Sequence, residues 1–239
     1  MIAYLLQSQA DLVRPPMAWL SAAEQAEYAA LRMPRRRQDW LAGRWTAKRL
    51  IQATRAEAAG APLAAIQLAP SSGRAPLASW PGCPQPWPIS ISHCDGRAAA
   101  ALCDEPRQPL GIDLEQVEAR SPAFADDYFT LDEIASLGRG LQAQAEQVTA
   151  IWCGKEAALK ALGLGLTVDT RSVSVRLKPA TGDSGGWRLL EVDAAGAQLE
   201  GCWRRQGPYV LTIVSGAANG RVISWPVEVQ SVGVQEKVA

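Results

Sequence analysis

The pair Asp113 and Glu115 is the first place where the residue types of this sequence could support chemistry. The surrounding segment Pro109–Glu115 (PLGIDLE) is typical of a β-strand. Side chains alternate along a strand, so the two carboxylates share one face, where their like charges repel. A divalent cation between them would remove the repulsion, and carboxylate oxygens without a nearby His or Cys cluster suit Mg²⁺ or Mn²⁺ better than zinc. The alternative is a half-exposed strand whose acidic face lies in water.

A second group of charges interrupts a helix predicted over Ile151–Gly165. The segment contains Lys, Glu, Ala and Leu without proline, and it ends on glycines. At about 100° per residue, its apolar stripe has Lys155 in the middle and Glu156 at the edge, with Lys160 one turn further along. A charge buried without a partner costs several kcal/mol, so this group needs a ligand, a metal or a partner carboxylate. The alternative is an ordinary i,i+4 ion pair between Glu156 and Lys160.

A third candidate site consists of basic residues. After Pro34, the segment Arg35–Arg55 is predicted to form a long helix. Arg36, Trp40 and Arg44 follow one another at i,i+4 spacing, so two arginines flank an aromatic side chain on one helix face. Guanidinium groups bind phosphate through paired hydrogen bonds, which makes this face a candidate phosphate site. The alternative is a solvated basic helix end.

Local signals predict the elements that must position these residues. Ser21 and Glu24 form a capping box that predicts a helix from about Ala22, and Thr130 and Glu133 form a second one. Further strands are predicted over Met1–Leu6, Arg171–Leu177, Trp187–Val192, Tyr209–Val214 and Val222–Val229.

The middle of the chain contains a predicted hairpin. Strands over Ile89–Gly96 and Ala98–Cys103 would join through a turn at Asp95 and Gly96. The hairpin carries His93, the single histidine of the sequence. Further along, Glu118–Ala125 is predicted to be a linker.

The bulk composition argues against several classes of protein. The 239 residues can bury a substantial core, and the 24 Lys and Arg balance the 24 Asp and Glu, which argues against nucleic-acid binding. No apolar run is long enough to span a membrane, and Met1–Leu6 lacks the features of a signal peptide. The five cysteines are odd in number and show no CxxC spacing, so we expect reduced thiols in a cytoplasmic protein. We also expect the protein to be a monomer.

Two motifs taken together resemble a known family. Gly111–Glu115 (GIDLE) followed by Trp152–Lys160 (WCGKEAALK) resembles the paired signature of the Sfp-type 4'-phosphopantetheinyl transferase superfamily. The similarity extends to Arg36–Arg44, Gly73–Pro76 and Ser90–Gly96.

The resemblance implies a fold. It is an α+β pseudo-dimer of two similar halves, residues 1–117 and 118–239, with the active site in the cleft between them. The first half would contribute the Arg and His elements and the Asp-x-Glu strand. The second half would contribute the helix with the Lys-Glu-x-x-x-Lys motif.

The resemblance also implies the site residues. The metal ligands would be Asp113, Glu115 and Glu156, and these would act in catalysis with Lys160. The residues that bind coenzyme A would be Arg36, Arg44, Arg74, Ser92, His93 and Lys160. At one point the pattern differs, because Arg74 replaces the family's lysine and Ala75 precedes Pro76. Lys155 has no assigned role beyond holding the acidic residues in place.

The implied activity is transfer of the 4'-phosphopantetheine arm of coenzyme A to a serine of an apo acyl or peptidyl carrier protein. The reaction would depend on Mg²⁺ or Mn²⁺ and release adenosine 3',5'-bisphosphate, with Glu156 or a water at the metal as proton acceptor. The carrier could serve fatty acid, polyketide or non-ribosomal peptide biosynthesis. The alternatives are another Mg²⁺-dependent phosphoryl enzyme and a non-catalytic binder of coenzyme A or carrier protein. Phe124–Leu137 is either the carrier docking surface or an ordinary core-facing segment.

Overall fold

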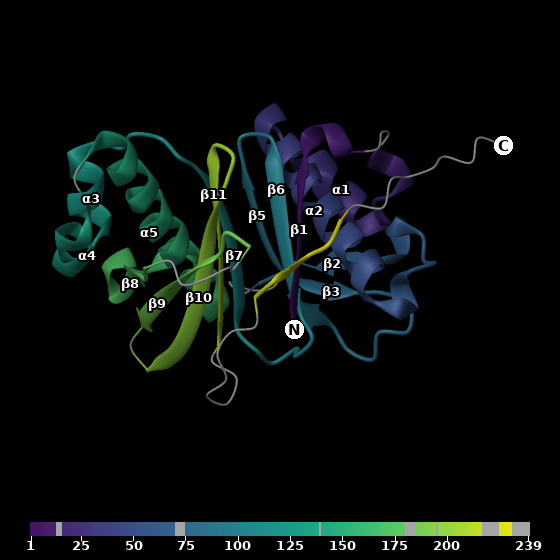
Figure 1. Cartoon of the computed structure of the whole chain (residues 1–239). Coiled ribbons are helices and arrows are strands. Elements are labelled where there is room, and N and C mark those ends of the chain that lie inside the picture. Colours follow the sequence, from purple (N-terminus) through teal and green to yellow (C-terminus); the bar gives the residue numbers. More distant parts are fainter. Residues whose placement is uncertain are drawn as a thin grey trace.

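Two β-sheets pack against each other, and a long helix covers the outer face of each (Figure 1). The computed structural model describes residues 1–12, 16–69, 75–138, 140–179, 185–194, 196–216 and 225–230. The helices are α1 (Ala22–Ala30), α2 (Pro34–Thr54), α3 (Pro122–Tyr128), α4 (Leu131–Ser136) and α5 (Leu141–Leu162). Short 3₁₀ helices lie at Gln9–Asp11, Pro16–Ala18, Ala56–Ala58, Leu63–Ala65, Gly165–Thr167 and Thr170–Ser172.

The first sheet has the strand order β12-β1-β6-β5, and β12 is the strand that runs parallel to its neighbour. Its strands are β1 (Ile2–Ser8), β5 (Ser90–Cys94), β6 (Arg97–Cys103) and β12 (Val227–Glu228). The predicted hairpin is confirmed, because β5 and β6 pair across a turn in which Asp95 has φ 43° and Gly96 has φ 73°. A small third sheet contains β2 (Gln67–Ala69), β3 (Leu77–Ser79) and β4 (Trp87–Pro88).

The second sheet is antiparallel, with the order β7-β11-β10-β9-β8. Its strands are β7 (Leu110–Gln116), β8 (Val173–Leu177), β9 (Arg188–Ala194), β10 (Ala197–Gln206) and β11 (Tyr209–Gly216). The strand that carries Asp113 and Glu115 is therefore hydrogen-bonded into the sheet of the later part of the chain, through β11.

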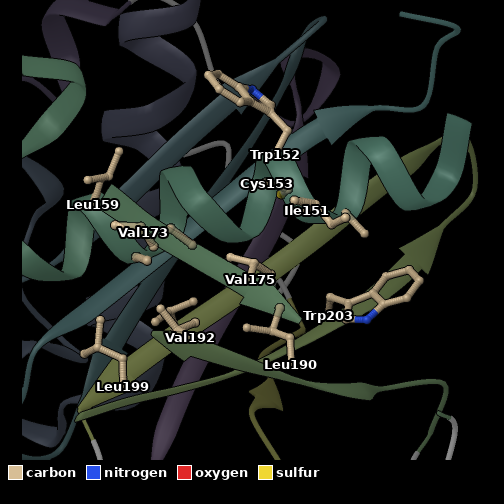
Figure 2. Close-up of a cluster of buried hydrophobic side chains, with 14 of the residues drawn as sticks. Ile151, Trp152, Cys153, Leu159, Val173, Val175, Leu190, Val192, Leu199 and Trp203 are labelled. Carbon is tan, nitrogen blue, oxygen red and sulfur yellow. The ribbon is translucent and has the colours of Figure 1, made fainter. Parts of the chain in front are cut away.

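Most of the buried apolar side chains that hold these elements together lie in three layers. One layer lies between the two sheets and includes Tyr4, Ile112 and Leu211. Another joins α2 to the outer face of the first sheet. The third joins α5 to the second sheet, where Ile151 and Leu159 of the helix lie over valines and leucines of the strands (Figure 2).

Most predicted helices form close to where the sequence places them. Both capping boxes are present, at Ser21 before α1 and at Thr130 before α4, and α2 begins at Pro34. The linker predicted over Glu118–Ala125 is wrong in its second part, because Pro122 begins α3 and proline is favoured at the first position of a helix.

The helix predicted over Ile151–Gly165 starts earlier, at Leu141 after Gly140, and ends at Gly163 in the left-handed conformation that favours glycine. Strand β10 has no counterpart among the predicted strands. Of the strand predicted over Val222–Val229, residues 227–228 form β12, and residues 222–224 lie outside the described residues.

Phe129 settles one of the alternatives for the segment Phe124–Leu137. Its side chain is 2% exposed and packs in the apolar layer beneath α5, so the core interpretation is right for this residue. The exposed apolar side chains of the segment are Tyr128, at 39%, and Leu131, at 84%. Across the part of the chain that the structure describes, no helix combines the length and apolarity that a bilayer span requires.

Candidate active site

Strand β7 and helix α5 bring three carboxylates together. Asp113 and Glu115 alternate with Ile112 and Leu114, which face the first sheet, so both acids face the helix. Glu156 lies on α5 opposite them, and one carboxylate oxygen from each of the three residues lies within 4.8 Å of the others. The predicted juxtaposition of the Asp-x-Glu strand with the Lys-Glu-x-x-x-Lys helix is therefore present in the structure.

Gly111 allows this close approach. A Cβ atom at this position would lie 1.8 Å from the carbonyl oxygen of Ala157 and 2.9 Å from the amide nitrogen of Ala161, both in the backbone of α5. No non-bonded atoms approach to 1.8 Å, so the helix can contact the strand here only because residue 111 lacks a side chain. Glycine is thus required two residues before Asp113 for a packing reason.

We expect Gly111→Ala to lower the free energy of unfolding by about 1–3 kcal/mol or more, as overpacking of a tight contact does. Because α5 must move away from β7, the variant should also bind divalent metal more weakly. Urea unfolding and Mn²⁺ titration measure the two effects. The matched control is Gly154→Ala in the same helix, where the new Cβ would lie 3.0 Å from a methyl group of Val175. A Gly111→Ala protein as stable as this control would show that the contact is not tight.

The hydrogen bonds of Asp113 leave one of its oxygens free. Oδ1 accepts from Lys160 Nζ at 2.6 Å and from Ser92 Oγ at 2.7 Å. Oδ2 is buried and has no hydrogen-bond partner among the described residues. A buried carboxylate oxygen without a partner is costly, and a cation beside it would remove that cost. The three carboxylates and this unpaired oxygen fit a divalent metal with oxygen ligands.

Burial and mutual repulsion perturb the ionisation of the cluster. Burial, and then the charge of Asp113, raise the pKa of Glu115 to about 7. The same two causes raise the pKa of Glu156 to about 7. For Lys160, burial favours the neutral form, but Asp113 and Glu156 together outweigh it and raise the pKa of the ammonium group. Near pH 7 the two glutamates of the metal-free cluster are therefore only partly ionised.

These pKa values predict how the stability of the metal-free protein depends on pH. The glutamates release their protons at lower pH in the unfolded chain than in the folded one, so the folded state holds more protons between their ordinary pKa and about 7. Linkage then requires the free energy of unfolding to fall as pH rises through this window. We expect the double variant Glu115→Gln, Glu156→Gln to gain stability relative to wild type as pH rises from 5 to 7.5 (roughly the range over which the two states differ in bound protons). Urea titrations in EDTA at several pH values measure this difference, and a constant difference would contradict the raised pKa values.

The residues predicted to bind coenzyme A lie in several places. Arg44 stacks on Trp40, with its guanidinium carbon 4.0 Å from the ring centre, and its Nη2 donates to Glu27 Oε2 at 2.6 Å. Arg36 is exposed in the first turn of α2. Arg74 lies outside the described residues.

Ser92 and His93 are neighbours on β5 but face opposite ways. Ser92 is buried and hydrogen-bonded to Asp113, within the acidic cluster. The His93 side chain is 49% exposed, with Nδ1 4.0 Å from Asp39 Oδ2 of α2. The structure therefore joins Ser92 and Lys160 to the three carboxylates, and it places His93 beside α2.

Two side chains near the cluster are missed by the sequence analysis. Arg120 Nη2 lies 3.2 Å from Glu115 Oε2, and Trp152 hydrogen-bonds the same carboxyl group. Trp152 also contacts the rings of Phe124 and Tyr128, with centroids 5.2 and 5.1 Å away. No local pattern marks Arg120, because it lies in an irregular segment after the strand. Trp152 is part of the apolar stripe, and that pattern does not reveal the hydrogen bond of its indole.

Lys155 does not contact the acidic cluster. Its Nζ lies 2.8 Å from Glu133 Oε2 and donates to the carbonyl oxygens of Thr170 and Val173. The expectation that it holds the metal-binding acids in place is wrong, because its partner is a different carboxylate at the start of α4.

Comparison with known proteins finds a similarity to one superfamily. Residues 109–214 match the family model described as the 4'-phosphopantetheinyl transferase superfamily. Over 90 residues the chain is 33% identical to the 4'-phosphopantetheinyl transferase Sfp of Bacillus subtilis (strain 168). That alignment covers 37% of this chain and 39% of Sfp, so the chain spans about two fifths of the length of the curated relative it matches. Residues 109–214 are therefore similar to the 4'-phosphopantetheinyl transferase superfamily.

Proposed function

We propose that this protein transfers the 4'-phosphopantetheine arm of coenzyme A to a serine of an apo acyl or peptidyl carrier protein and releases adenosine 3',5'-bisphosphate. One observation carries the proposal: the three carboxylates of Asp113, Glu115 and Glu156 converge, with Lys160 beside them, within the segment that matches the superfamily. A protein that only binds coenzyme A would not need all four groups.

A divalent cation completes the proposed site. Asp113, Glu115 and Glu156 would hold Mg²⁺ or Mn²⁺, and the unpaired Oδ2 of Asp113 supports this assignment. When bound, the cation supplies positive charge that neutralises a pyrophosphate as its P–O bond breaks.

The chain's own residues would supply the rest of the chemistry. Lys160 would act as a point charge toward the pyrophosphate, one helical turn from Glu156. Arg36, Arg44, Arg74 and His93 would hold the remaining phosphates. For Arg44 this means exchanging Glu27 for a phosphate, since the two compete for the same guanidinium group. Glu156 would accept the proton of the attacking serine as a general base.

The proposed fold is a pseudo-dimer of residues 1–117 and 118–239 with the active site at their junction. Each range supplies most strands of one sheet and the long helix, α2 or α5, on its outer face, which supports two related halves. The acidic cluster draws Ser92 and Asp113 from the first range and Glu156 from the second. β7 joins the two ranges, because it precedes the boundary and pairs with β11.

We also propose that the protein works in the cytoplasm as a monomer. All five cysteines (Cys83, Cys94, Cys103, Cys153 and Cys202) are free thiols, which supports a reducing compartment.

The intact mass of candidate carrier proteins tests the function. Apo carrier proteins from fatty acid, polyketide and non-ribosomal peptide synthesis are incubated with coenzyme A, Mg²⁺ and this protein. A mass gain of one phosphopantetheine is expected, and the relative rates identify the preferred carrier. Cleavage of coenzyme A without a gain of mass by any carrier would favour another phosphoryl enzyme. Binding without turnover would favour a non-catalytic binder.

Carrier docking is expected at the exposed apolar residues of α3 and α4. Tyr128 contacts Trp152, which hydrogen-bonds Glu115, so this surface adjoins the cluster. Leu131→Glu should raise the KM for carrier protein about fivefold or more, as loss of an interface anchor does, and leave the KM for coenzyme A unchanged. Leu141→Glu is the matched control, because Leu141 is also an exposed first residue of a helix. Equal effects of the two changes would exclude Leu131 from the docking surface.

A further inference from the structure

Two serine hydroxyls connect β5 to β7 at the active site. The two strands are edges of different sheets. Ser90 Oγ accepts a hydrogen bond from the backbone N–H of Ile112 at 2.9 Å, and Ser92 Oγ accepts one from Leu114 at 3.3 Å. Both serines are buried, with 2% and 6% of their surface exposed. They therefore satisfy amide groups that the edge of β7 would otherwise leave unpaired.

Ser92 makes one contact that Ser90 does not. A hydroxyl has a single hydrogen to donate, and Ser92 donates it to Oδ1 of Asp113 at 2.7 Å. Lys160 donates to the same oxygen at 2.6 Å. Oδ1 is thus engaged by two donors, and Oδ2 is the carboxylate oxygen that stays buried without a partner among the described residues.

We propose that Ser92 is a positioning residue for the metal site, which holds the Asp113 carboxylate so that Oδ2 is presented to the cation. The inference rests on the proposed function, because it takes the three carboxylates as metal ligands. In this proposal Ser92 serves the metal site and does not bind coenzyme A. The phosphates of coenzyme A would be bound by His93, whose side chain lies on the opposite face of β5. It also makes the metal site depend on β5, an element outside the segment that matches the superfamily.

The physical need for such a residue comes from charge. Glu115 and Glu156 lie close enough to Asp113 to repel its carboxylate when no cation is present. Rotation about the bonds of the Asp113 side chain would relieve that repulsion and turn the carboxylate away. Hydrogen bonds from Ser92 and Lys160 oppose the rotation, so a cation meets ligands that are already oriented. Partners of metal ligands in this position commonly change metal affinity by about 10–100-fold.

Mn²⁺ binding, followed by electron paramagnetic resonance, tests the proposal without relying on turnover. Wild type, Ser92→Ala and Ser90→Ala are titrated with Mn²⁺ alone. Ser90→Ala is the matched control, because it removes the same kind of bond to a β7 amide from the same strand but no contact with a carboxylate. We expect Ser92→Ala to bind Mn²⁺ about 10–100-fold more weakly and Ser90→Ala to bind within about twofold of wild type. In EDTA, the melting temperatures of the two variants should fall below that of wild type by similar amounts.

A second variant covers the case in which Ser92→Ala does not fold. Ser92→Cys is close in size but a weaker donor, so it should lose part of the affinity. In transfer assays, the KM for metal should rise while the KM for coenzyme A stays unchanged.

Three outcomes would overturn the proposal. Unchanged Mn²⁺ affinity in the Ser92 variants would show that the hydroxyl does not position Asp113. Equal losses in the Ser90 and Ser92 variants would assign both serines to holding the strands together. A raised KM for coenzyme A with unchanged Mn²⁺ affinity would make Ser92 a coenzyme A ligand. If wild type itself binds no Mn²⁺, the proposed metal site fails, which distinguishes that failure from the other three.

Discussion

Asp113→Asn is expected to lower kcat/KM for phosphopantetheine transfer by about a thousandfold or more. A bound cation contributes several kcal/mol of charge stabilisation to the transition state, and each 1.36 kcal/mol corresponds to about a factor of ten. The change places an amide N–H₂ group where the unpaired Oδ2 lies, and this group repels a cation. The remaining oxygen can still accept from Lys160 and Ser92, so the fold should be retained.

Removal of the metal from wild type should have the same effect. Transfer is measured by intact mass with Mg²⁺, with EDTA, and with EDTA followed by excess Mg²⁺, which should restore activity. The control variant is Asp193→Asn, an exposed aspartate on β9 that should leave the rate unchanged. Full activity in EDTA, or in Asp113→Asn, would contradict metal-dependent transfer at this site.

Lys155→Met is expected to have the largest effect on stability, lowering the free energy of unfolding by about 3–5 kcal/mol. That is the scale measured when one partner of a buried ion pair is removed. The side chains of Lys155 and Glu133 are 0% and 1% exposed, and their charged atoms lie 2.8 Å apart. Without the lysine, Glu133 would remain buried with a charge and no cation. The carbonyl oxygens of Thr170 and Val173 would each lose a donor.

Two comparisons isolate the buried pair. Lys178→Met removes a lysine that pairs with Glu191 at the surface, and it should lower the stability far less than Lys155→Met. The double variant Lys155→Met, Glu133→Gln should recover part of the loss, because it no longer buries an uncompensated charge. Urea unfolding measures all three. A Lys155→Met protein with unchanged stability but no transfer activity would instead place Lys155 in the active site.

Local sequence patterns predicted much of the acidic cluster. Strand alternation placed Asp113 and Glu115 on one face, and helix geometry placed Glu156 and Lys160 near each other, because residues four apart differ by about 40° around a helix. Capping boxes located α1 and α4 from hydrogen bonds that span three residues. These features depend on neighbours along the chain, so the sequence contains the information needed to predict them. That the strand and the helix meet was predicted from the resemblance of their paired motifs to a known superfamily.

Tertiary packing decided the features that join distant residues. Helix geometry alone does not predict the partner of Lys155. Glu133 lies 22 positions earlier in the chain, and it reaches Lys155 only because α4 packs beside α5. The Ser92 hydroxyl reaches Asp113 only because the edges of the two sheets meet. Glycine is needed at position 111 because the backbone of α5 at Ala157, 46 residues later in the chain, lies against it. Propensity and periodicity describe the state of each segment, whereas burial and pairing depend on which segments meet. The sequence alone therefore determined the carboxylates and the faces on which they lie, and the assembled sheets and helices determined which oxygen of Asp113 stays unpaired.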